Sequence, residues 1–294
     1  MEEERPLENY YFENLRKEEY QGSEIKLEKI IAEEEKYTSW LFSFQTEGKK
    51  VTGMVNLPEG EGPFPVVVML RGYADEKIYF TGLGTRKAAG VFAQQGFATF
   101  APDFLGFGGS DSSSSDVLEA RFERPVTVLN LIASIEKSNK ELFLDSEKLF
   151  LWGHSNGGQI ALSVLEITKG EYPTVLWAPV TKGFPESITQ YMDEDSLDEI
   201  GLKVKERIEE FVVEYDEKKV SIDEYFADIV APIQLHQGGK DFLVPQNWSD
   251  AFVVEMKRMG KKIDYYQYPQ SDHNLSPDWD EVVKRDIFFF KSFF

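Results

Sequence analysis

The sequence contains no cysteine among its 294 residues. Disulfide bridges, thiolate zinc sites and a cysteine nucleophile are therefore excluded. Basic residues are also scarce, because 32 lysines and arginines stand against 52 acidic residues, which gives a formal net charge of −20. A polyanion of this kind is a poor ligand for nucleic acids and anionic membranes, and its field disfavours strongly anionic substrates. We therefore expect neither nucleic acid nor a membrane as a partner.

Long apolar runs are missing as well. No stretch approaches the length needed to cross a membrane, and the start of the chain, Met-Glu-Glu-Glu-Arg, has the opposite charge of a signal peptide. These features predict a soluble chain, either cytoplasmic or secreted with a signal peptide that is absent from this sequence. The compartment and the oligomeric state stay open. The 41% of hydrophobic residues is enough for a sizeable core.

What the chain does contain is a regular alternation of apolar strands and amphipathic helices after residue 65. The region 25–57 before it favours β-structure. The proline at position 125 predicts a break or a fresh start within a long helical stretch. The alternation predicts an α/β fold with a mostly parallel sheet flanked by helices. Strands are expected at 25–32, 37–45, 51–57, 66–70, 97–101, 149–152, 174–178, 233–236 and 263–268, and helices at 85–95, 117–137, 246–259 and 280–294.

Two segments depart from this alternation. Residues 1–24 are acidic and aromatic, and they form either a helix packed on the body or an arm for a partner. Residues 180–230 show no strand pattern, but apolar residues recur at helical spacing between 204 and 215. We predict an N-terminal acidic segment over 1–24 and one α/β domain over 25–294, in which 180–230 is a helical lid over the carboxyl ends of the strands. An ordinary crossover helix lengthened by a loop is the alternative.

The hexapeptide Gly-His-Ser-Asn-Gly-Gly at 153–158 follows an apolar strand and precedes a helix. It matches the G-x-S-x-G nucleophile elbow in the context that this motif requires. The glycines leave room for a sharp turn. The hydroxyl of Ser155 would stand at a helix N-terminus, where peptide dipoles favour developing negative charge. A strand–helix turn that merely contains a serine is the alternative.

A serine hydroxyl needs a general base, and that base usually needs an orienting carboxylate. The chain offers three histidines. We expect His154, which adjoins Ser155, to point elsewhere, and His236, at the end of a strand, to be structural. His273 lies in the loop between the last strand and the last helix, which opens on the same sheet edge as the elbow. We predict that His273 is the base.

Two carboxylates compete to orient His273. Asp272 is its neighbour in sequence, and a neighbouring side chain rarely reaches the ring nitrogen well. Asp241 follows a strand and a glycine turn at the same sheet edge, and the order Ser155, Asp241, His273 is that of α/β-hydrolases. We therefore predict a triad with Asp241, which can also cap the helix near Gln246.

The oxyanion of such a reaction needs two hydrogen-bond donors. The backbone N–H of Asn156, which follows the serine, is the first predicted donor. The backbone N–H of Tyr73, in the loop after the strand 66–70, is the second, with Gly72 allowing the turn. No cluster of ligands predicts a metal ion, and this chemistry requires no cofactor.

Three motifs together resemble the catalytic motifs of the α/β-hydrolase superfamily: residues 153–158, 236–245 and 271–273. The likeness covers about residues 50–294 and points to the catalytic domain of the prolyl-oligopeptidase-like group, including acylaminoacyl-peptidase-like and dienelactone-hydrolase-like esterases. It implies an α/β-hydrolase fold and a serine hydrolase. Many members of the group have His-Gly in the oxyanion loop where this chain has arginine at position 71, a residue that could shape the acyl side or pair with a carboxylate.

The predicted activity is therefore hydrolysis of uncharged carboxylic esters through an acyl-enzyme, with a small-molecule ester as the substrate. A serine peptidase of the acylaminoacyl or dipeptidyl type is one alternative. An esterase for aromatic acyl groups such as ferulate is another, suggested by Phe80, Trp177, Phe184 and Tyr191, which otherwise belong to the core or the lid. A non-catalytic binding module on a hydrolase scaffold is a third.

Overall fold

A computed structural model of the protein describes residues 5–192 and 199–294. Within these residues a single nine-stranded sheet has the order β1-β2-β3-β5-β4-β6-β7-β8-β9. Antiparallel pairing joins β1, β2, β3 and β5, and the remaining pairs are parallel. The strands are β1 (Lys26–Glu33), β2 (Tyr37–Thr46), β3 (Lys49–Pro58), β4 (Phe64–Leu70), β5 (Ala98–Pro102), β6 (Leu144–His154), β7 (Thr174–Trp177), β8 (Ile233–Gly238) and β9 (Ile263–Tyr268).

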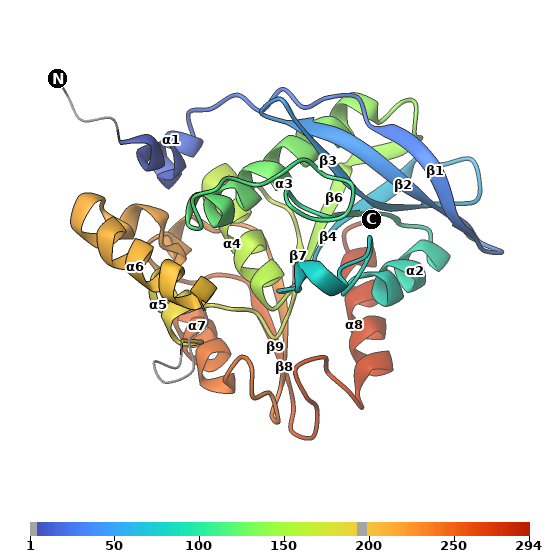
Figure 1. Ribbon diagram of the computed structural model, residues 1–294. Coiled ribbons are helices and arrows are strands. Elements are labelled where there is room, and N and C mark those ends of the chain that lie inside the picture. The colour runs from blue at the N-terminus through green and yellow to red at the C-terminus, as the bar shows by residue number, and fades with distance from the viewer. Residues whose placement is uncertain (1–4, 193–198) are drawn as a thin grey trace.

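Helices cover both faces of this sheet (Figure 1). The predicted α/β architecture with a mostly parallel sheet is confirmed. The α-helices are α1 (Phe12–Leu15), α2 (Arg86–Gln94), α3 (Glu119–Ser138), α4 (Asn156–Thr168), α5 (Glu186–Thr189), α6 (Glu199–Glu214), α7 (Gln246–Arg258) and α8 (Trp279–Lys291). Short 3-10 helices are η1 (Pro6–Tyr10), η2 (Glu76–Ile78), η3 (Glu217–Val220), η4 (Ile222–Glu224) and η5 (Phe226–Asp228).

Strand β4 shows why the central strands are continuously apolar. Its alternate residues Val66, Val68 and Leu70 are buried in one cluster with side chains of α3, α4 and α7. Val67 and Met69 are buried in a second cluster with side chains of α2 and α8. Because successive side chains of a strand point to opposite faces, a strand covered on both faces needs an uninterrupted apolar run.

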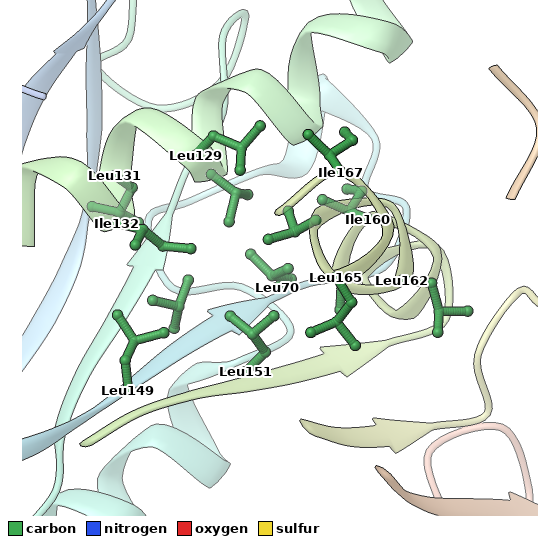
Figure 2. Packing of buried hydrophobic residues seen from close by; sticks show 14 of the residues in the cluster. Leu70, Leu129, Leu131, Ile132, Leu149, Leu151, Ile160, Leu162, Leu165 and Ile167 are labelled. Carbon is green, nitrogen blue, oxygen red and sulfur yellow. The ribbon is translucent and has the colours of Figure 1, made fainter. Parts of the chain in front are cut away.

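The first of these clusters holds α4 against the sheet. Figure 2 shows Leu129 and Ile132 of α3, Ile160 and Leu165 of α4 and Leu151 of β6 gathered in this layer. Burial of one such side chain stabilises the fold by about 1.5–3 kcal/mol. The N-terminus of α4, which begins directly after the predicted nucleophile, is therefore fixed relative to β6.

The break or fresh start predicted at Pro125 is wrong, because α3 continues through this residue. Proline lacks the N–H that would bond to the carbonyl of Arg121. The start of the helix is nevertheless capped, since the carboxylate of Asp116 accepts hydrogen bonds from the N–H groups of Leu118 at 2.8 Å and Glu119 at 3.2 Å. Most residues after the proline are buried, and this tertiary packing outweighs the missing hydrogen bond.

The N-terminal segment packs on the body of the protein from residue 5 onward. Leu7, Tyr11, Phe12 and Leu15 are buried. Residues 1–4 of the segment predicted over 1–24 lie outside the described residues.

The region 180–230 contains α5, α6 and the 3-10 helices η3 to η5. Ile208 and Phe211 of α6 are buried in a cluster with Leu7 and Leu118, so this region and the N-terminal segment share one apolar layer. Its part between 193 and 198 lies outside the described residues. None of the helices in the described part of the chain combines the length and the apolar character needed to cross a membrane.

Glu166, near the end of α4, is fully buried. Among the described residues, neither of its carboxyl oxygens has a hydrogen-bond partner. Burial raises its pKa well above the usual range, and the negative charge of Asp223 adds to this effect. The folded protein therefore holds a proton on Glu166 that the unfolded chain releases at lower pH.

Replacing this carboxyl group tests its protonation. The stabilising contribution of a group with a raised folded pKa is complete below its unfolded pKa and is lost as the pH rises toward the folded pKa. We expect Glu166→Gln to remove this loss, so that its stability relative to the wild type increases by about 1.4 kcal/mol per pH unit up to the folded pKa. Urea unfolding at pH 5 and pH 8 measures the effect.

Glu209→Gln, at an exposed position of α6, controls for the loss of one charge. The same pH dependence of stability in the wild type and in Glu166→Gln would contradict the assignment of a protonated Glu166.

Candidate active site

Ser155 lies at a strained turn between β6 and α4. Its φ of 56° and ψ of −123° belong to a region that residues with a side chain rarely adopt. A Cβ atom on Gly153 would lie 2.6 Å from the carbonyl oxygen of Gly157, and one on Gly157 would lie 2.0 Å from that of Leu70. Both positions therefore require glycine for reasons of space, as the elbow motif predicts.

The loop after β4 approaches Ser155 directly. A Cβ atom on Gly72 would lie 2.9 Å from the Cβ and 3.4 Å from the Oγ of Ser155. The N–H groups predicted to bind an oxyanion belong to Tyr73, next to this contact, and to Asn156, the first residue of α4. Among the described residues, neither N–H donates to an acceptor of the protein. Both are thus available to a ligand.

Asp241 and His273 contact each other beyond the ends of β8 and β9. The Nδ1 atom of His273 lies 2.8 Å from Oδ2 of Asp241. The other oxygen, Oδ1, accepts hydrogen bonds from the N–H groups of Leu243 and Val244, both at 2.9 Å. Burial acts to raise the pKa of Asp241, but the hydrogen bonds from His273, Val244 and Leu243 outweigh it and lower the pKa. Asp241 is therefore a carboxylate at neutral pH.

The competing carboxylate, Asp272, bonds within its own loop. Its Oδ1 atom accepts hydrogen bonds from the N–H groups of Asn274 at 2.9 Å and Ser276 at 3.0 Å. Asp272 thereby shapes the loop that carries His273, whereas Asp241 contacts the imidazole itself.

His154 is a residue of the site that the sequence analysis set aside. Its Nε2 atom lies 2.9 Å from the carbonyl oxygen of His273, and the two rings are 4.6 Å apart. Burial and then the charge of His273 lower the pKa of His154 to about 4, so it is neutral at pH 7. His154 therefore holds the loop of His273. Its position beside the serine in the elbow was the only signal for this contact.

His236 lies in the core instead. It is fully buried, and its Nε2 atom lies 3.0 Å from Oδ1 of Asp286 while its Nδ1 atom lies 2.9 Å from the hydroxyl of Tyr268. Trp177 donates a hydrogen bond to the other oxygen of Asp286 at 2.9 Å. Trp177 is thus part of this buried network.

Arg71 is buried beside the predicted oxyanion loop. Its guanidinium lies 4.1 Å from the ring centre of Phe107 and 4.7 Å from that of Tyr79. It donates hydrogen bonds to the backbone carbonyls of Gly72 at 2.9 Å and Asp103 at 3.1 Å. Its contact with Asp103 therefore involves the carbonyl and not the carboxylate, and it holds the β4 loop in place.

The other aromatic side chains considered for substrate contact differ in exposure. Phe80 is 53% exposed and Tyr191 is 49% exposed. Phe184 is buried and packs against the rings of Phe122 and Phe211.

A mostly parallel sheet, a serine at a strand–helix elbow and a carboxylate–histidine contact beyond the following strands define an α/β-hydrolase. Residues 84–292 match the prolyl oligopeptidase family, and the chain belongs to this family. This agrees with the family indicated by the three sequence motifs.

Solved structures with similar folds include esterases and peptidases. The acetyl xylan esterase from Paenibacillus sp. R4 is 16% identical, with a TM-score of 0.67 over 97% of this chain and 94% of that chain. The acylaminoacyl peptidase of Pyrococcus horikoshii is 19% identical, with a TM-score of 0.62 over 88% of this chain and 41% of that chain. At these identities the likeness concerns the fold alone.

A curated relative is similar over a shorter region. It is the uncharacterized 31.7 kDa protein in the traX-finO intergenic region of Escherichia coli, which is 29% identical over 118 residues, or 38% of this chain. The chain spans about a third, 36%, of the length of that relative.

The packing of the elbow makes Gly157 a sensitive position. We expect Gly157→Ala to destabilise the protein by about 3 kcal/mol or more, because its Cβ would overlap the carbonyl of Leu70 and the backbone on both sides would have to move. Chemical denaturation measures the change in the free energy of unfolding.

Gly260→Ala is the control, since this glycine has a φ of 72° and nothing within 4 Å of a Cβ atom. The control change introduces only left-handed strain, which costs about 1–2 kcal/mol. A smaller loss for Gly157→Ala than for Gly260→Ala would show that the elbow is not tightly packed.

Proposed function

We propose that this protein is a serine hydrolase that cleaves carboxylic esters through an acyl-enzyme on Ser155. One observation carries the proposal: the 2.8 Å contact between Nδ1 of His273 and Oδ2 of Asp241, at the sheet edge where Ser155 occupies its strained turn. An imidazole held by a carboxylate at Nδ1 presents Nε2 as a proton acceptor. Together with Ser155 at the elbow and the two N–H groups, this contact supports a nucleophile, a base and an oxyanion site for acyl transfer.

In the proposed reaction, the Oγ atom of Ser155 attacks the ester carbonyl and transfers its proton to His273. Asp241 stabilises the resulting imidazolium. The N–H groups of Asn156 and Tyr73 bind the oxyanion, and each such donor contributes about 10²–10³-fold in turnover. The imidazolium then gives its proton to the leaving alcohol. Water attacks the acyl-enzyme by the same steps and releases the acid.

Esters are proposed as substrates in preference to peptides. The acetyl xylan esterase resembles this chain over 94% of its own length, whereas the acylaminoacyl peptidase does so over 41%. A peptidase of the acylaminoacyl or dipeptidyl type is the second candidate, because the chain belongs to the prolyl oligopeptidase family. An aromatic-acyl esterase has less support, since Trp177 and Phe184 are engaged in buried contacts.

We further propose that residues 180–230 act as a lid over a small-molecule substrate. Tyr191, in this region, is influenced by the charges of Asp241 and Arg121. Burial, and next the charge of Asp241, raise its pKa to about 12. The region thus reaches the surroundings of the proposed acid and of α3.

Labelling with a fluorophosphonate tests the nucleophile. We expect the wild type to be labelled and to hydrolyse 4-nitrophenyl butyrate, and Ser155→Ala to do neither, because the reagent needs an activated serine. Ser112→Ala, at an exposed loop position, is the control and should behave as the wild type. Labelling that survives Ser155→Ala refutes the proposed nucleophile. Turnover of butyryl-4-nitroanilide as fast as that of the ester would instead favour the peptidase.

Matched substitutions of the two competing carboxylates test the orienting role. In Asp241→Asn, the amide nitrogen that replaces Oδ2 cannot accept the Nδ1 proton of His273, so we expect kcat to fall about 10³–10⁴-fold. Asp272→Asn retains an oxygen for its loop hydrogen bonds and should stay within about tenfold of the wild type. Steady-state kinetics with 4-nitrophenyl butyrate measure both. An equal loss in the two variants argues against Asp241 as the orienting acid.

A further inference from the structure

Two arginines of α3 have no acidic partner. Arg121 and Arg124 are partly buried, and among the described residues neither side chain forms an ion pair or a hydrogen bond with the protein. This is unusual in a chain with twenty more acidic than basic residues, 52 against 32. The other partly buried arginines, Arg16, Arg207 and Arg285, each contact a carboxylate.

Glu123, which lies between the two arginines in sequence, interacts with other residues. Glu123 lies 3.5 Å from the ammonium group of Lys49 and accepts a hydrogen bond from the N–H of Ser114 at 3.2 Å. At i and i+3, Arg121 and Arg124 lie on one face of α3. That face is therefore positive without an internal counter-charge.

Both arginines line a cavity that lies beside the proposed nucleophile. The cavity has a volume of about 60 Å³, and its wall includes Asn156 and Gln159 of α4. Asn156 directly follows the proposed nucleophile, and its N–H is a proposed oxyanion donor. The opposite walls are largely apolar and come from the N-terminal segment and the region 180–230. A space equal to about two water molecules admits a small polar group at the end of a substrate.

Two other positive charges, those of Arg121 and Arg71, act on Arg124 in this region. Burial, and then the positive charges of Arg121 and Arg71, lower the pKa of Arg124 to about 9. Burial also lowers the pKa of Arg121, and the nearby Tyr191 and Tyr73 act in the opposite direction. Arg71 offers no compensation, because it contacts only carbonyls and aromatic rings. Uncompensated buried charges are costly, and an anion placed between them would remove that cost.

We propose that Arg121 and Arg124 bind a carboxylate group of the substrate whose ester is cleaved at Ser155. This inference rests on the proposed function and names its substrate class: esters that carry a free carboxylate on the acyl or the alcohol side. The planar guanidinium matches the two oxygens of a carboxylate. A singly charged group also suits the small cavity and a protein whose distant field is negative. We therefore propose carboxylate-bearing esters as substrates in place of the uncharged esters that the sequence analysis predicts.

Paired substrates test the proposal. Mono(4-nitrophenyl) adipate and 4-nitrophenyl hexanoate have acyl chains of equal length and differ by one carboxylate. The salt of 4-acetoxybenzoic acid and its methyl ester place the same difference on the leaving side. We expect the wild type to prefer the anionic member of at least one pair in kcat/KM. The pair that shows the preference identifies the side that carries the carboxylate.

Variants assign this preference to the arginines. For each of Arg121→Gln and Arg124→Gln, we expect the anionic-to-neutral ratio of kcat/KM to fall about tenfold to a hundredfold, mainly through KM. Lysine at the same positions keeps the charge but loses the fork, and should restore part of the ratio. Arg86→Gln, at an exposed position of α2, removes the same charge and should leave the ratio unchanged. An unchanged ratio in the α3 variants, or an equal fall in Arg86→Gln, overturns the proposal.

A binding measurement separates this proposal from the proposed reaction. Calorimetry with monomethyl adipate on Ser155→Ala should show binding that is lost when Arg121 and Arg124 are both changed to glutamine. Binding of this kind without ester turnover by the wild type would refute the reaction and keep the carboxylate site. Hydrolysis of neutral esters with neither an anionic preference nor binding of monomethyl adipate would refute the site and keep the reaction.

Discussion

The strained backbone at Ser155 is the constraint on which the rest of the site depends. A non-glycine residue in this conformation costs on the order of 1–3 kcal/mol and persists only where its surroundings determine it. Both backbone groups of Ser155 are engaged, because its N–H donates to the carbonyl of Trp177 at 2.9 Å and its carbonyl accepts from Val180 at 3.0 Å. With β4 and β7 paired on either side of β6 and α4 packed above, the turn has no room to relax.

Two histidine–aspartate pairs occur among the described residues, through Nε2 of His236 and through Nδ1 of His273, and they have opposite consequences. His236 and Asp286 are fully buried, and burial raises the pKa of Asp286 despite its hydrogen bonds. His273 has a side chain that is 12% exposed, and the pKa of its partner Asp241 is lowered because the hydrogen bond from His273 and those from two backbone N–H groups outweigh burial. Only the pair at the sheet edge combines a stable carboxylate with an imidazole that a ligand can reach, whereas the buried pair joins α8 to β8.

Charge acts on this protein at two length scales. The net charge of −20 governs the approach of ligands from a distance and is screened beyond about 10 Å. Within the cavity beside α4, the nearest charges are those of Arg121 and Arg124. A substrate would therefore meet a repulsive field that salt weakens and then a local attraction in a drier environment, where a given charge acts more strongly. Whole-chain composition thus says little about the specificity of a pocket.

The sequence alone determined the order of strands and helices, the elbow at 153–158 and the loops that meet at one sheet edge. These features follow from local periodicity, from short steric motifs and from the parallel topology. The tertiary structure alone decided that Asp272 bonds its own loop, that His154 bonds the carbonyl of His273, and that α3 continues past its proline. It also brought two arginines of α3 to the start of α4. Such contacts join residues far apart in the chain, and their side-chain directions depend on packing that local sequence does not encode.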